Sequence, residues 1–214
     1  MKRTLRRAPA VRPTPRDDLE PRNDRELVYA ARVGDDRAFD ALFYRYRDGV
    51  YRLSLAITKD PQAAEEVVLD TFARAYRALA RLEPDDTLRP WLYRVAINES
   101  YDRRPRGVAQ TPLDLADELA MPDDGSPARM AERAEDRRVV LAAVGSLDDK
   151  HRTVVVLHYL NELPLAEIGH IVGAPVGTVK SRLHYALKAL RVHLAQQPGF
   201  HIEPAGRSAA TGEK

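Results

Sequence analysis

The sequence of 214 residues contains no cysteine. Without a thiol the chain can form no disulfide framework, thiolate zinc site or iron–sulfur cluster, and the absence fits a reducing compartment. Long apolar runs are also missing, since the longest is Val139–Val144, whereas a membrane-spanning helix needs about 20 residues. The basic amino terminus is not followed by an apolar stretch, so no export signal is expected. We therefore expect a cytoplasmic protein with no membrane insertion.

Acidic residues are absent from one long stretch, although the whole chain is nearly neutral. It has 34 Lys and Arg against 32 Asp and Glu, a formal charge of +2. No Asp or Glu lies between Glu167 and Glu203, a stretch that includes Lys180, Arg182 and Lys188. We expect one surface of this segment to be positive and to attract a polyanion.

No alternating run is long enough to indicate a β-strand, and apolar residues recur at intervals of three and four. These patterns predict an all-α fold. Asn23 and Glu26 have the spacing of a capping pair, and Asp60-Pro61 is a typical helix start. The helices are expected at about 23–33, 36–57, 61–79, 88–103, 129–144 and 148–160, with two shorter ones within 164–195.

Proline and charge divide the chain into two small helical domains, at 23–105 and 129–197. Residues 1–22 hold seven basic residues and four prolines with few large apolar side chains, a composition typical of a disordered basic arm. Residues 106–128 are again rich in proline and acids, which predicts a flexible linker. The tail at 198–214 is expected to be loose.

The segment 163–194 has the pattern of a helix-turn-helix. Gly173 would end its first helix and Pro175 would begin the second, each with an apolar inner side. Cations and hydroxyls then lie on the outer side near the start of the second helix, where a recognition helix meets the major groove. The alternative interpretation is an amphipathic helical hairpin with a solvated basic surface. A solvated helix usually mixes both signs of charge, which makes this alternative the weaker one.

Three motifs resemble those of a known family. The string PVGTVKSRL at 175–183 resembles the recognition helix in region 4 of sigma-70 family factors of the extracytoplasmic-function (ECF) group. Residues 60–76 resemble region 2.2, and the string LRPWLYRVAIN at 88–98 resembles regions 2.3 and 2.4. The resemblance covers roughly 23–105 and 129–195, with the motifs in the family's order.

The resemblance implies a dissociable subunit of RNA polymerase rather than an enzyme. Region 2 would bind core RNA polymerase and open promoter DNA at the -10 element, while region 4 would recognise the -35 element. It implies no active site and no cofactor. An anti-sigma factor is the further partner that such a protein is expected to have.

The same resemblance assigns site residues by position. For the -10 element it implies Asn98 as a base contact, with the loop 84–89 nearby. Backbone contacts there would come from Arg94, Arg103, Arg104 and Arg106. Polymerase contacts would come from Glu66, Leu69 and Asp70. The implied -35 contacts are Thr178, Lys180, Ser181, Arg182, His184 and Tyr185.

Other interpretations remain open at this point. A stand-alone helix-turn-helix regulator would also bind DNA, with 23–105 acting as a sensing or dimerising domain. Trp91 could stack on an unpaired base, although a lone tryptophan is more often part of the core or its rim. The six histidines lack the spacing of a metal motif and have no cysteine partners, so no metal site is expected.

Overall fold

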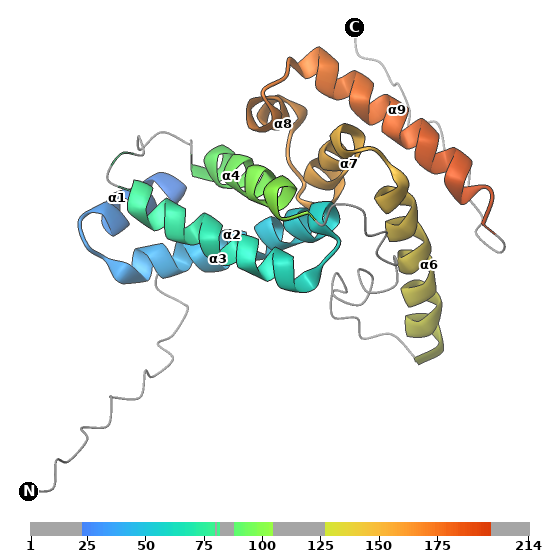
Figure 1. The fold of residues 1–214 in the computed structure, drawn as a ribbon. Coiled ribbons are helices and arrows are strands. Elements are labelled where there is room, and N and C mark those ends of the chain that lie inside the picture. The colour runs from blue at the N-terminus through green and yellow to red at the C-terminus, as the bar shows by residue number, and fades with distance from the viewer. Residues whose placement is uncertain (1–22, 80, 82–87, 105–126, 198–214) are drawn as a thin grey trace, which may run out of the picture.

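The computed structural model describes residues 23–79, 81, 88–104 and 127–197. Every regular element within these ranges is helical, as predicted (Figure 1). The predicted basic arm and tail lie outside the described residues, as does the predicted linker except for its last two positions, which begin a helix. The elements are α1 (Asp24–Arg32), α2 (Asp36–Thr58), α3 (Pro61–Ala78), α4 (Leu88–Arg103), α6 (Pro127–Ser146), α7 (Asp149–Val155), the π-helix η2 (Val156–Leu160), α8 (Leu165–Val172) and α9 (Val176–Leu194).

Local side-chain chemistry fixes the helix starts that the sequence predicted. At α1 the Glu26 amide donates to Asn23 Oδ1 at 2.9 Å, and the Asn23 amide donates to Glu26 Oε2 at 3.2 Å. Asp60 caps α3 by accepting from the Ala63 amide at 3.2 Å, directly before Pro61. Each cap satisfies an amide that the first helical turn leaves unpaired.

The helix predicted to reach residue 160 changes its geometry before it ends. Regular α-helical bonding stops at Val155, and the amide of Asn161 then donates to the Val156 carbonyl at 3.1 Å, five residues back. This wider turn is the π-helix η2. It leads into Glu162, whose φ of 54° lies in the left-handed region. The helix reaches Leu160 as predicted, and its last turn is a π-helix that the sequence did not reveal, because hydrophobic periodicity does not distinguish i−4 from i−5 bonding.

Helices α2, α3 and α4 form the bundle of the first unit, with α1 packed on α2. Phe72 of α3 meets Phe43 of α2 edge to face, with ring centroids 4.8 Å apart. Leu42 of α2 and Leu92 of α4 are almost fully buried in the same cluster. Trp91 is partly buried against this core, in agreement with its interpretation as a core or rim residue.

A buried arginine fastens the end of α6 to α7. Only 3% of Arg152 is exposed, and its guanidinium donates to the carbonyls of Val144 at 3.3 Å and Gly145 at 2.9 Å, and also to that of Leu147. Val144 and Gly145 lie in the last turn of α6, where the intrahelical donors run out, and Leu147 directly follows the helix. The arginine supplies donors to these carbonyls and so joins the end of α6 to α7.

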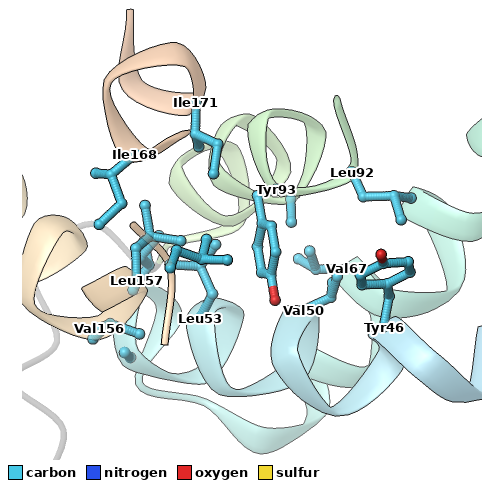
Figure 2. Close-up of a cluster of buried hydrophobic side chains, with 14 of the residues drawn as sticks. Tyr46, Val50, Leu53, Val67, Leu92, Tyr93, Val156, Leu157, Ile168 and Ile171 are labelled. Carbon is cyan, nitrogen blue, oxygen red and sulfur yellow. The ribbon is translucent and has the colours of Figure 1, made fainter. Parts of the chain in front are cut away.

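The two units share one hydrophobic core rather than standing apart. Figure 2 shows Ile168 and Ile171 of α8 gathered with Leu157 of η2, Leu53 of α2 and Tyr93 of α4. Each of these side chains is at most 4% exposed. Burial raises the pKa of Tyr93 to about 12. Since apolar burial contributes about 25 cal/mol per Å², this shared core stabilises the packed arrangement.

None of the helices described has the length and apolar character needed to cross a membrane.

A close approach to neighbouring side chains occurs at Gly49 in the middle of α2. A Cβ there would overlap the Tyr93 hydroxyl and would lie 3.2 Å from Asn161 Oδ1. Tyr93 lies on α4 in the same unit as Gly49, and Asn161 lies in the second unit. A glycine at this position is therefore required mainly by the packing of α4 on α2, and not by its backbone conformation.

Gly49→Ala is expected to destabilise the protein by about 1–3 kcal/mol, because the extra methyl must displace a buried tyrosine. Gly177→Ala is the matched control, since nothing lies within 4 Å of a Cβ at that helical glycine. Helix propensity alone favours alanine at both sites. Urea unfolding followed by circular dichroism measures the two changes, and an unchanged midpoint for Gly49→Ala would contradict the proposed packing.

Candidate nucleic-acid interface

The turn between α8 and α9 has the tight geometry of a helix-turn-helix. Gly173 ends α8 with φ of 64°, a left-handed conformation that glycine adopts at little cost. Gly169 faces the turn so closely that a Cβ there would lie 2.8 Å from the Ala174 carbonyl oxygen. Pro175 then precedes the first residue of α9. The inner side of the motif is buried through Ile168, Ile171, Val179, Leu183 and Ala186.

Helix α9 lies away from α2 and α3 (Figure 1). Lys180, Ser181, His184 and Tyr185 are exposed, whereas Thr178 and Arg182 are half-buried. The structure thus brings all six predicted -35 residues together over the first three turns of the helix. We name this set the α9 surface.

Three side chains of the α9 surface also make contacts within the helix. Ser181 donates its hydroxyl within the helix, to the carbonyls of Gly177 at 3.2 Å and Thr178 at 3.0 Å, so its side chain is partly engaged. The rings of His184 and Tyr185 lie edge to face with centroids 5.5 Å apart, and 61% of Tyr185 is exposed. An exposed aromatic ring next to cations is a suitable contact for a base or a sugar.

The predicted -10 residues do not share one surface, because α4 turns them to different sides. Arg94 and Arg104 face the second unit: the Arg94 Nε donates to the Ile171 carbonyl at 3.4 Å, and Arg104 Nη1 lies 2.6 Å from Asp149 Oδ1. Asn98 is exposed to solvent. Arg106 and most of the loop 84–89 lie outside the described residues.

Arg103 turns to the opposite side and meets the acidic residues of α3. It pairs with Asp70 and with Glu99, and its Nε lies 3.9 Å from Glu66 Oε2. The bond to Glu99 is the largest of the contributions that raise the Arg103 pKa. Two predicted polymerase residues and one predicted DNA residue therefore form a single ion-pair network.

Glu99 is the centre of this network, and sequence reasoning missed it. Only 6% of the residue is exposed, and its second oxygen lies 2.5 Å from Arg74 Nη2. Its spacing of four residues from Arg103 is the signal that could have revealed it. The third predicted polymerase residue, Leu69, stands beside the network on α3 with 64% of its surface exposed.

No group of three or more histidine, aspartate or glutamate side chains among the described residues is arranged to hold a metal ion. The features that remain are the α9 surface, the exposed amide of Asn98 and an exposed leucine among acids, which together suit binding to nucleic acid and to another protein.

Comparison with protein families gives two matches in the same chain. The model of sigma-70 region 2 matches residues 42–107, and the model of sigma-70 region 4 matches residues 143–192. The first covers α3, α4 and most of α2, and the second covers the helix-turn-helix with the helix before it. Their order along the chain is that of the motifs described above.

Whole-chain relatives carry the same assignment. The RNA polymerase sigma-H factor of Pseudomonas aeruginosa is 33% identical over 80% of this chain and 94% of its own. The ECF RNA polymerase sigma factor SigW of Bacillus subtilis is 32% identical over 79% of this chain and 96% of its own. Both alignments span nearly the whole length of the relative.

A solved structure agrees with the fold. CnrH, determined in complex with the cytosolic domain of CnrY, superimposes with a TM-score of 0.62 at 26% identity, over 81% of this chain and 99% of CnrH. The chain therefore belongs to the ECF group of the sigma-70 family, the RNA polymerase sigma factors that direct transcription initiation at particular promoters.

Proposed function

We propose that α9 reads the -35 element of a promoter, that α4 acts at the -10 element, and that α3 contacts core RNA polymerase. The observation that carries the proposal is the α9 surface: six candidate contacts, four exposed and two half-buried, within three turns of the second helix of a helix-turn-helix, in a stretch with no acidic residue. The units 23–105 and 129–197 would divide these tasks between them. The protein would act in the cytoplasm, without catalytic chemistry of its own.

Arg182 is the leading candidate for -35 recognition. A guanidinium donates two parallel bonds to a guanine edge or to a phosphate, and both geometries occur in major-groove recognition. Lys180 and Thr178 flank it on the first turns of α9 and suit backbone phosphates. In this proposal Arg182 contacts the base, while Lys180 and Thr178 bind the phosphates that position α9 in the groove.

Asn98 is the leading candidate at the -10 element. Its exposed amide can pair with the edge of a base that has left the stack. Arg94 lies on the same helix and Arg104 directly follows its end, and both suit the strand backbone. Arg103 is the least suited of the arginines to bind phosphate, because Glu66, Asp70 and Glu99 already compensate its charge.

Two protein partners are proposed. Leu69 projects from α3 next to Glu66 and Asp70, a mixture of apolar centre and charged rim that is typical of protein interfaces. We assign this patch to core RNA polymerase. An anti-sigma factor is proposed as the second partner, since the structural relative CnrH was solved with the cytosolic domain of CnrY.

The direct test is run-off transcription with purified core RNA polymerase and a library of promoter fragments. Core enzyme together with this protein should start transcripts on a subset of templates. The stand-alone regulator is disfavoured by the family assignment. The result that would favour the stand-alone regulator is the absence of transcripts on every template, together with tight binding of the protein to duplex DNA without polymerase.

Arg182→Ala should reduce transcription from promoters that need the -35 element. Loss of one bidentate base contact corresponds to about 1–3 kcal/mol, or roughly five- to 150-fold in affinity. Arg191→Ala is the matched control. Arg191 is exposed nine residues further along the same helix, and its substitution removes the same charge. Equal loss in both variants, or a loss of core binding, would argue against base reading by Arg182.

Asn98→Ala should leave closed-complex formation intact, because the residue is proposed to contact only a base that has left the stack. Loss of a contact worth about 1.4 kcal/mol should lower the open-complex fraction by about tenfold. Permanganate footprinting of unpaired thymines measures opening, and filter binding measures the closed complex. Gln62→Ala provides the control, since Gln62 is an exposed amide on α3. Wild-type reactivity in the Asn98 variant would remove this residue from the -10 site.

A further inference from the structure

The charge of α3 changes sign along its length. Its first half carries the acidic residues proposed to meet polymerase, the last of which is Asp70. No acidic residue lies between Asp70 and Glu83, and this stretch contains Arg74, Arg77 and Arg81. A partner surface that complements the acidic half would repel the basic half. The two halves of α3 therefore suit different partners.

The three arginines lie at the exposed end of α3. Arg74 and Arg77 are three residues apart, the spacing of neighbouring side chains on one side of a helix. The helix ends at Ala78, and the Arg81 amide donates to the Ala78 carbonyl at 2.8 Å, so the chain continues in a further turn. All three arginines are exposed. We name this set the α3 basic end.

Two of these arginines carry charge that no acidic group compensates. Arg74 Nη2 lies 2.5 Å from Glu99 Oε1. In the part of the chain that the structure describes, no ion pair or side-chain hydrogen bond joins Arg77 or Arg81 to another residue. The arginines along α4 differ, because carboxylates or carbonyls already bind them. The charge of Arg77 and Arg81 is thus available to an anionic partner.

The pair between Arg74 and Glu99 places the α3 basic end beside the exposed amide of Asn98. Arg103, four residues after Glu99, pairs with Asp70, four residues before Arg74. Helices α3 and α4 are therefore antiparallel at this point, and residues after Arg74 lie alongside residues before Glu99. Asn98 directly precedes Glu99 and is exposed. The α3 basic end thus extends from the level of Asn98 towards the start of α4.

A single strand of DNA fits this arrangement better than a small anion. Binding of one small anion needs donors that converge on a point, whereas Arg77 and Arg81 follow each other along the chain. A row of cations beside a base-binding group is the general form of a single-strand site, in which the cations follow the backbone. Guanidinium groups also bind phosphate through two parallel hydrogen bonds.

We propose that Arg77 and Arg81 bind backbone phosphates of the single strand whose base pairs with Asn98. The inference rests on the proposed role of Asn98 at the -10 element. Arg74 is a positioning residue in this arrangement, because its pair with Glu99 holds the end of α3 beside α4. The strand then lies between two helices, with its base at α4 and part of its backbone at the α3 basic end.

Binding of the holoenzyme to a promoter fragment with an unpaired -10 segment tests the phosphate contacts. Arg77→Ala and Arg81→Ala should each weaken binding and lower the slope of log affinity against log salt by about 0.7, a factor of about five over a tenfold range of salt. The loss should not depend on the base offered to Asn98, because phosphates carry no sequence information. Arg77→Lys should restore most of the salt dependence, since it keeps the charge.

Lys150→Ala is the matched control for loss of one positive charge. Lys150 is exposed at the start of α7. That region lies near the end of α2, where Lys59 Nζ donates to the Gly145 carbonyl at 3.0 Å. The end of α3 lies instead at the start of α2, where the rings of Tyr76 and Phe39 have centroids 5.1 Å apart. Lys150→Ala should leave the salt slope unchanged.

Proximity of the strand is tested separately from affinity. The chain has no cysteine, so an iron chelate that cleaves DNA locally can be attached to Arg81→Cys alone. In open complexes with core polymerase, this variant should cleave the unpaired strand within the -10 segment. Lys150→Cys with the same chelate is the control and should not cleave there.

Three results would overturn the inference. The first is a salt slope in Arg77→Ala and Arg81→Ala equal to that of Lys150→Ala. The second is the same cleavage pattern from Arg81→Cys and Lys150→Cys. The third is a loss of core binding that accounts for the whole effect, which would assign these arginines to polymerase. Run-off transcription by the unaltered chain tests the proposed function separately: absence of transcripts rejects that function, whereas any of the three results beside normal transcription rejects this inference alone.

Discussion

The ion pair between Arg89 and Glu167 is the contact on which the arrangement of the two units depends. It links the start of α4 to the first turn of α8, and the Arg94 cap of α8 lies just over one turn further along α4. On the same helix α8, Ile168 and Ile171 pack with the apolar side of α2 and α4, as Figure 2 shows. Directional contacts at the rim set the register, and apolar burial then supplies the stabilisation.

Helix α4 meets different demands on each of its sides. Towards α3 it carries Glu99 and Arg103, which close an ion-pair network over the acidic edge. Towards α7 it carries Tyr101, whose hydroxyl lies 3.0 Å from Thr153 Oγ1, and Arg104. Asn98 is left exposed between these two sets of contacts. A rigid helix held on both sides presents a single exposed amide in a fixed position, and such preorganisation lowers the entropy cost of capturing a base.

Helix positions and much of the α9 surface could be predicted because they depend on local chemistry. The Asn23 cap and the Gly173 stop are encoded within a few residues, and helical periodicity places Lys180 on the outer side of α9. The packing of the units could not be predicted, since an apolar residue such as Ile168 does not specify its partner. Sequence reasoning likewise placed Arg94, Arg103 and Arg104 together, although a step of a single residue directs Arg103 to α3 and Arg104 to α7. The π-helix at Val156–Leu160 could not be predicted either, because it is defined by its backbone hydrogen bonds and not by a pattern of side chains.

The distribution of compensated and uncompensated charge distinguishes α9 from α4. On the α9 surface the cations lie in a stretch without acids. Along α4 and directly after it, the arginines already bind Glu167, Asp149 and backbone carbonyls. The near-zero net charge is a sum over both helices, so it describes neither of them. The difference between α9 and α4 follows only from which cations have partners in the folded chain.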